Sequence, residues 1–216
     1  MMTSEKRSAL VIGATGLVGE KVVAKLLSSE KYTHVKVLVR KPLTLSHPKL
    51  ESILFDFDRP EPALVQADDV FCCLGTTMKK AGSKEAFYRV DYTYPYQIAE
   101  MALANGAKRF SIITAMGADR NSMFYYNRVK GEIEDALKKL GYDALLIFRP
   151  SLLLGDRKEA RFGEKVGEKL SKFFRFLIPA KYRAIEADKV AEAMVSITAS
   201  NVKGTLVYAS DLMQEF

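Results

Sequence analysis

The chain has 216 residues, which is enough for one domain with a substantial buried core, and we expect no second full domain. Hydrophobic residues make up 48% of the chain and charged residues 27%, which is typical of a soluble globular protein. No apolar run approaches the roughly 20 residues that a membrane span requires. The first residues, MMTSEKR, contain no hydrophobic signal segment, so we predict a cytoplasmic protein without a transmembrane segment.

The only two cysteines, Cys72 and Cys73, are adjacent and lie within an apolar run. Adjacent cysteines rarely bridge each other, and two cysteines cannot form a disulfide framework. Because the chain has only two histidines, we also expect no metal cluster. We interpret both cysteines as reduced, buried thiols in a reducing compartment.

Short apolar stretches rich in β-branched residues alternate with helical patterns along the chain. The predicted strands are residues 8–14, 35–40, 51–57, 69–75, 109–115, 143–150 and 205–210. The predicted helices are residues 20–30, 84–106, 126–141 and 188–200, with a weaker pattern at 63–67. Strands that are apolar on both faces indicate a doubly wound, mostly parallel α/β sheet covered by helices on each side. We predict one such domain over residues 1–216, with a small helical extension on the substrate side at about 155–185.

A glycine-rich turn follows the first predicted strand and opens the first predicted helix. Gly13, Gly16 and Gly19 occur there in the sequence GATGLVGE. The first glycine permits the tight turn, the second lets the backbone approach a pyrophosphate, and the third lets helix and strand pack closely. The helix N-terminus adds free N–H groups and a partial positive charge. We therefore predict a Rossmann fold with a dinucleotide site. Within the same turn, Thr15, Leu17 and Val18 are also assigned to this site.

The residues after the second and third strands indicate which dinucleotide is bound. Arg40 and Lys41 stand where NAD-binding folds usually place an acidic residue, and an arginine accommodates a 2′-phosphate. We therefore predict that both residues bind NADP(H), although Arg40 is alternatively a solvated strand end. Asp56 is predicted to accept a hydrogen bond from the adenine amino group, with a helix-capping role as the alternative. Phe57 is assigned to the same site.

The fourth strand runs into Cys73, Leu74, Gly75 and Thr76, at the edge of the sheet where ligands bind in open α/β folds. Gly75 lets a cofactor lie close to the backbone, and Thr76 offers a hydroxyl to a ribose or a phosphate. Cys73 and Leu74 are expected to line the site without taking part in the chemistry.

Tyr126 and Lys130 are four residues apart in the predicted helix 126–141, so both side chains project from the same face. A positive charge beside a phenol favours the tyrosinate. Such a phenol can give a proton to a carbonyl oxygen or take one from an alcohol. The core stripe of this helix comprises Val129, Ile133, Ala136 or Leu137, and Leu140, which leaves Tyr126 and Lys130 facing the cleft.

A strand-end threonine, Tyr-x-x-x-Lys on the next helix and the glycine turn together resemble the atypical short-chain dehydrogenases/reductases. The chain is similar to the Tat-interacting-protein-like oxidoreductases over roughly residues 8 to 200. The stretches that carry the similarity are FCCLGTT, KAGS, FYRVDYTY, TAMGAD, FYYNRVKGEIE and FRPSLLLGDR.

This resemblance implies NADPH binding and a Thr114–Tyr126–Lys130 catalytic set. Tyr126 would be the acid and base, and Lys130 would bind the nicotinamide ribose and favour the ionised phenol. Thr114 would orient the substrate oxygen. The family often carries two hydroxyl residues at this strand end, but here Ala115 follows Thr114. Two further cofactor-binding residues, Pro150 and Ser151, match the family's turn beside the nicotinamide.

The segment 157–183 has nine basic residues and three glutamates, so it holds +6 of the net charge of +7. Within residues 164–177 one predicted helical face carries Val166, Leu170, Phe173, Phe174 and Leu177. We expect this face to dock over the substrate cleft. The alternative is weak contact with a membrane surface or a protein partner. Because no nucleic-acid reading motif is present, we expect no nucleic-acid partner.

The sequence thus predicts an NADP(H)-dependent oxidoreductase that acts on a small carbonyl or alcohol. Two alternatives stay open, because one fold hosts several functions. The first is an NADPH-binding regulatory or scaffold protein with little turnover. The second is a nucleotide-sugar epimerase or dehydratase, which would use the same tyrosine and lysine.

Overall fold

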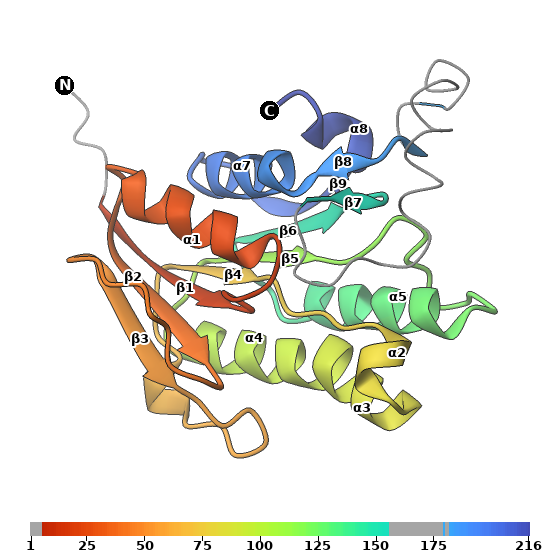
Figure 1. Ribbon diagram of the computed structural model, residues 1–216, viewed down its shortest axis with the longest axis horizontal. Coiled ribbons are helices and arrows are strands. Elements are labelled where there is room, and N and C mark those ends of the chain that lie inside the picture. The colour runs from red at the N-terminus through yellow and green to blue at the C-terminus, as the bar shows by residue number, and fades with distance from the viewer. Residues whose placement is uncertain (1–5, 156–178, 180–181) are drawn as a thin grey trace.

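Seven parallel strands form the central sheet in a computed structural model, which describes residues 6–155, 179 and 182–216 (Figure 1). In spatial order they are β3 (Leu50–Leu54), β2 (Tyr32–Val39), β1 (Arg7–Ile12), β4 (Asp69–Cys72), β5 (Arg109–Ile113), β6 (Ala144–Arg149) and β9 (Gly204–Ala209). The chain order reverses between β1 and β4, as in a doubly wound fold, where ligands bind at this switch point. The predicted fold class is therefore confirmed.

Helices cover both faces of the sheet (Figure 1). On one face α1 (Gly19–Ser28) packs against α7 (Ala187–Thr198), and their apolar sides share a core with β1, β2 and β6. On the other face α4 (Tyr94–Ala104) and α5 (Tyr125–Lys138) form a second core with β4 and β5. Burial on both faces explains why the central strands are apolar throughout rather than alternating.

The shorter elements show where the sequence pattern was incomplete. They are η1 (Pro62–Leu64), α2 (Met78–Ala81), α3 (Lys84–Tyr88), the π-helical turn η2 (Arg89–Thr93), β7 (Leu153–Leu154), β8 (Ile185–Glu186) and α8 (Ser210–Met213). The helix predicted at 84–106 is interrupted by η2, and the weak pattern at 63–67 is the 3₁₀ turn η1. The small parallel pair β7–β8 was not predicted.

The predicted extension at about 155–185 and its basic helix at 164–177 fall mainly on residues 156–178 and 180–181, which lie outside the described residues. Within the described part of the chain, no helix has the length and the apolar character that crossing a membrane requires.

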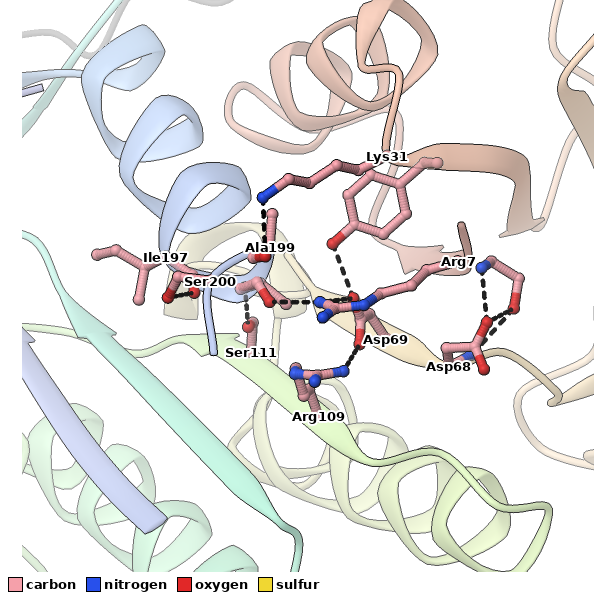
Figure 2. A network of polar contacts seen from close by, with 12 residues as sticks. Arg7, Lys31, Asp68, Asp69, Arg109, Ser111, Ile197, Ala199 and Ser200 are labelled. Carbon is pink, nitrogen blue, oxygen red and sulfur yellow. Dashed lines mark hydrogen bonds and ion pairs between the residues drawn. The ribbon is translucent and has the colours of Figure 1, made fainter. Parts of the chain in front are cut away.

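The amino-terminal edge of the sheet is held together by one buried carboxylate, that of Asp69 (Figure 2). The hydroxyl of Tyr32 donates to Asp69 Oδ2 over 2.8 Å, and Arg109 Nη1 donates to Asp69 Oδ1 over 3.0 Å. Arg7 Nη1 lies 3.5 Å from Oδ2 and also donates to the Thr198 carbonyl. Because these three partners and Asp69 are the first residues of β1, β2, β4 and β5, one side chain fixes where four strands begin.

We predict that Tyr32→Phe lowers the free energy of unfolding by about 1.5 to 3 kcal/mol, because it removes a hydrogen bond to a buried charged group. Urea unfolding followed by circular dichroism measures this change. The control is Tyr208→Phe. The ring of Tyr208 stacks on Phe148, and its hydroxyl has no hydrogen-bond partner among the described residues. Equal losses in the two variants would contradict a structural role for the Asp69 network.

Candidate active site

The residues predicted to bind cofactor or substrate gather at the opposite, carboxyl-terminal edge of the sheet. The groups follow β1, β2, β4, β5 and β6 directly, and they begin at Gly13, Arg40, Cys73, Thr114 and Pro150, respectively. Because all these strands are parallel, their carboxyl ends meet at one edge. The structure therefore brings these groups to the carboxyl-terminal edge of the sheet, where ligands bind at the switch point between β1 and β4.

The glycine turn fits tightly between β1, α1 and the end of β4. Gly13 has a φ of +80°, and a Cβ there would lie 2.5 Å from the backbone carbonyl carbon of Cys73. A Cβ on Gly19 would lie 2.1 Å from the carbonyl oxygen of Gly13. The turn closes through a 3.0 Å hydrogen bond from Gly16 N to Gly13 O. The shape of this turn and the N-terminus of α1 that follows it fit a pyrophosphate. Such a group binds where the backbone can approach it closely and where a helix N-terminus offers its partial positive charge.

The other predicted residues of this turn have different environments. Thr15 is exposed, whereas the side chain of Val18 lies in the core, so only its backbone can face a nucleotide. Leu17 lies next to Gly155, because a Cβ built on this glycine would be 2.8 Å from the nearest methyl group of Leu17. The turn is therefore close to the segment after β7.

Arg40 and Lys41 are exposed just beyond β2, beside the strand that carries the glycine turn. Asp56 Oδ1 accepts a 2.9 Å hydrogen bond from the backbone N–H of Asp58, so this carboxylate also stabilises a local turn. Phe57 is buried and packs on Phe55 and Tyr94, which makes its side chain part of the core.

Lys130 has a buried side chain although it carries a charged group, and only 4% of the residue is exposed. Its Nζ lies 2.7 Å from Oδ1 of Asp91, a carboxylate that is itself buried. Burial alone would lower the pKa of Lys130, but the attraction of Asp91 and Tyr126 outweighs it and raises the pKa above the usual value. The ammonium therefore stays protonated at neutral pH. One turn earlier, Tyr126 is 38% exposed, so its phenol is open to solvent.

Tyr125, the other tyrosine at the start of α5, differs from Tyr126 in the contact of its hydroxyl. The Tyr125 hydroxyl donates to the Lys84 carbonyl over 2.9 Å, whereas the rings of both tyrosines pack on Phe87. The chain thus uses Tyr125 to attach α5 to α3.

The hydroxyl of Thr114 belongs to a hydrogen-bond network with Glu134 and Arg149. It donates to Glu134 Oε1 over 2.6 Å, and Glu134 is paired with Arg149 through both carboxylate oxygens, including a 3.0 Å bond from Nε to Oε1. Glu134 lies one turn after Lys130, so the network joins α5 to the ends of β5 and β6. In this arrangement the hydroxyl hydrogen of Thr114 is not directed at a substrate.

The turn after β6 is also fixed by hydrogen bonds. The Pro150 carbonyl accepts from Met116 N over 3.0 Å, which joins the loops after β5 and β6. The Ser151 hydroxyl lies 2.9 Å from that of Ser210 and also donates to the Arg183 carbonyl.

The loop after β4 lies against the lysine. A Cβ on Gly75 would be 3.8 Å from Lys130 Nζ and 3.6 Å from Asp91 Oδ1, and Thr76 N donates to Asp91 Oδ2 over 2.9 Å. Burial raises the pKa of Cys72 to about 12, so this thiol stays protonated. Cys73 is half-buried, and both cysteines are free thiols.

A family model described as NAD(P)H-binding matches residues 13–201. The chain belongs to this family. The family resemblance that the sequence motifs indicated is thereby confirmed.

Two curated relatives and one solved structure agree with this assignment. Protein HTATIP2 of Rattus norvegicus is 37% identical over 171 residues, 76% of this chain and 70% of that protein. The mitochondrial protein FMP52 of Candida albicans is 32% identical over 92% of this chain and 91% of its own length. A short-chain dehydrogenase family protein from Francisella tularensis has the same fold, with a TM-score of 0.69, 16% identity and coverage of 97% of this chain and 99% of its own.

We predict that Glu134→Gln lowers the free energy of unfolding by about 1.5 to 3 kcal/mol, because it removes the charge of a buried carboxylate that is hydrogen-bonded to the half-buried Arg149. Denaturant unfolding at neutral pH checks this. The matched control is Glu192→Gln, which removes the same charge from an exposed pair with Lys25 and should cost less than about 1 kcal/mol. A similar effect of both changes would show that the Thr114–Glu134–Arg149 network does not hold the site together.

Proposed function

We propose that the protein is an NADP(H)-dependent oxidoreductase that acts on a small carbonyl or alcohol, with Tyr126 as general acid and base. The observation that carries this proposal is the buried, charged Lys130 on the same helix face as the open phenol of Tyr126, at the sheet edge that holds the glycine turn. A site of this kind can bind a dinucleotide and move a proton beside it.

The roles of the two residues follow from their surroundings. Asp91 keeps Lys130 protonated, so a positive charge lies one turn after Tyr126 on the same face of α5. Tyr126 can therefore give its proton to a carbonyl oxygen in one direction and take it from an alcohol in the other. A bound nicotinamide cofactor supplies or accepts the hydride.

The cofactor would be held along the sheet edge by the turn Gly13–Gly19 and the loop Cys73–Thr76. Thr15 is exposed within the turn, and Pro150 with Ser151 lies at the end of β6. In this proposal Thr114 acts only as an acceptor, because its hydrogen is donated to Glu134. A cytoplasmic location remains part of the proposal.

The preference for NADP(H) over NAD(H) rests on Arg40 and Lys41, two exposed cations immediately after β2. A guanidinium pairs with a phosphate through two parallel hydrogen bonds, which an NAD ribose hydroxyl cannot reproduce.

We expect Tyr126→Phe to lower the rate of NADPH-dependent reduction by about 10²- to 10⁴-fold, because the proton donor is lost. A panel of aldehydes and ketones assayed by NADPH absorbance measures this. The control is Tyr125→Phe, which deletes a neighbouring hydroxyl that donates to Lys84 and should leave the rate nearly unchanged.

Two outcomes would decide against the assignment. Full activity in Tyr126→Phe would contradict its acid–base role. NADPH binding without turnover of any substrate in the unmodified protein would instead favour a regulatory protein that holds the nucleotide.

We expect Arg40→Ala to weaken NADPH binding by about tenfold or more and to leave NADH binding unchanged, because a charge-assisted bond to the 2′-phosphate contributes about 1.5 to 3 kcal/mol. Fluorescence titration with each nucleotide measures both affinities. Lys108→Ala, which removes an exposed cation at the opposite edge of the sheet, is the control for net charge. Equal weakening by both substitutions would contradict a specific phosphate contact.

A further inference from the structure

Asp91 contacts two parts of the candidate site; it lies in the stretch FYRVDYTY, but no role was assigned to it from the sequence. Its carboxylate is buried, with Oδ1 at 2.7 Å from Lys130 Nζ and Oδ2 accepting a 2.9 Å hydrogen bond from Thr76 N. Thr76 belongs to the loop after β4, and Lys130 belongs to α5. One side chain on a third element therefore connects the two.

A local departure from α-helical geometry places this carboxylate. Asp91 lies in the π-helical turn η2, where Tyr94 N donates to the Arg89 carbonyl five residues back. The cause is visible in the sequence, because Pro95 has no N–H to offer the carbonyl four residues before it, which is that of Asp91. Proline commonly interrupts the hydrogen-bond ladder of a helix, and π-turns occur frequently at functional sites.

The charges around Lys130 leave Asp91 as its principal counter-charge. The titratable groups that interact with the ammonium are Asp91 on η2, Tyr126 on its own helix and Cys72 on β4. The Cys72 thiol is protonated at neutral pH, because burial raises its pKa to about 12. The ion pair of Nζ with Asp91 Oδ1 has a distance of 2.7 Å.

We propose that Asp91 is a positioning residue, which fixes the Lys130 ammonium and the Gly75–Thr76 loop in one arrangement that is ready to receive the cofactor. The role in cofactor binding rests on the proposed function, whereas the link between Lys130 and the loop rests on the contacts of Asp91. A buried charge needs a counter-charge, so the carboxylate keeps the lysine protonated inside the protein. Its second oxygen holds the loop by accepting the hydrogen bond from Thr76 N.

Two substitutions separate the charge of Asp91 from its hydrogen bond. Asp91→Asn removes the charge but keeps an oxygen that can accept from Thr76 N. Asp91→Ala removes both. The control is Asp135→Asn, which removes an acidic group on the outer side of α5 that pairs with Lys138 and Arg120.

The first readout is the titration of Lys130 in the protein without nucleotide, followed by NMR of labelled lysine side chains and assigned with Lys130→Arg. In the unmodified protein the raised pKa keeps Lys130 charged until the pH passes above the usual value of 10.5. In Asp91→Asn burial dominates, so we expect the pKa of Lys130 to fall below that value, while Asp135→Asn leaves it unchanged. An unchanged titration in Asp91→Asn would overturn the proposal.

The second readout is NADPH affinity, measured by calorimetric titration. We expect about tenfold weaker binding in Asp91→Asn and a larger loss in Asp91→Ala, with folding checked by circular dichroism. Unchanged affinity in a folded Asp91→Asn would overturn the positioning role. Should the unmodified protein fail to bind NADPH, the proposed function falls, and the titration of Lys130 still decides whether Asp91 controls the lysine.

Discussion

A charged lysine can be buried only beside an opposite charge, and the burial of Lys130 governs the arrangement of the candidate site. The counter-charge of Asp91 comes from the π-helical turn η2, which lies just before Pro95. The second oxygen of the same carboxylate holds the loop after β4. The lysine, the carboxylate and the loop therefore form one unit, beside which the phenol of Tyr126 remains open to solvent.

The two edges of the sheet divide stability and chemistry between them. At the amino-terminal edge, Asp69 joins the first residues of four strands in a buried network with no open phenol (Figure 2). At the carboxyl-terminal edge, buried pairs involving Asp91 and Glu134 stabilise α5 from both sides. Tyr126 and the glycine turn are among the parts of that edge that remain able to meet a ligand.

Features set by short-range sequence patterns were predictable from the sequence. The parallel sheet follows from strands that are apolar on both faces, and the glycine turn from three glycines between a strand and a helix. Tyr126 and Lys130 share a helix face because they are one turn apart. The shared sheet edge of the loops after β1, β4 and β6 follows from the parallel order of the strands.

Features that depend on contacts distant in sequence were not predictable in the same way. Asp91 looks like an ordinary helix acid, and only Pro95 four residues later gives a local sign of the π-turn. Glu134 has the spacing of a surface residue, although it is buried against Arg149. The direction of the Thr114 hydroxyl depends on that pair, so a strand-end threonine alone could not reveal it.

The measurement that tests the central claim most directly is a crystal structure of the protein grown with NADPH. We predict that the nucleotide lies along the Gly13–Gly19 turn and reaches the Lys130 ammonium beside Tyr126. A nucleotide bound away from this edge, or one separated from Lys130 by intervening side chains, would contradict it.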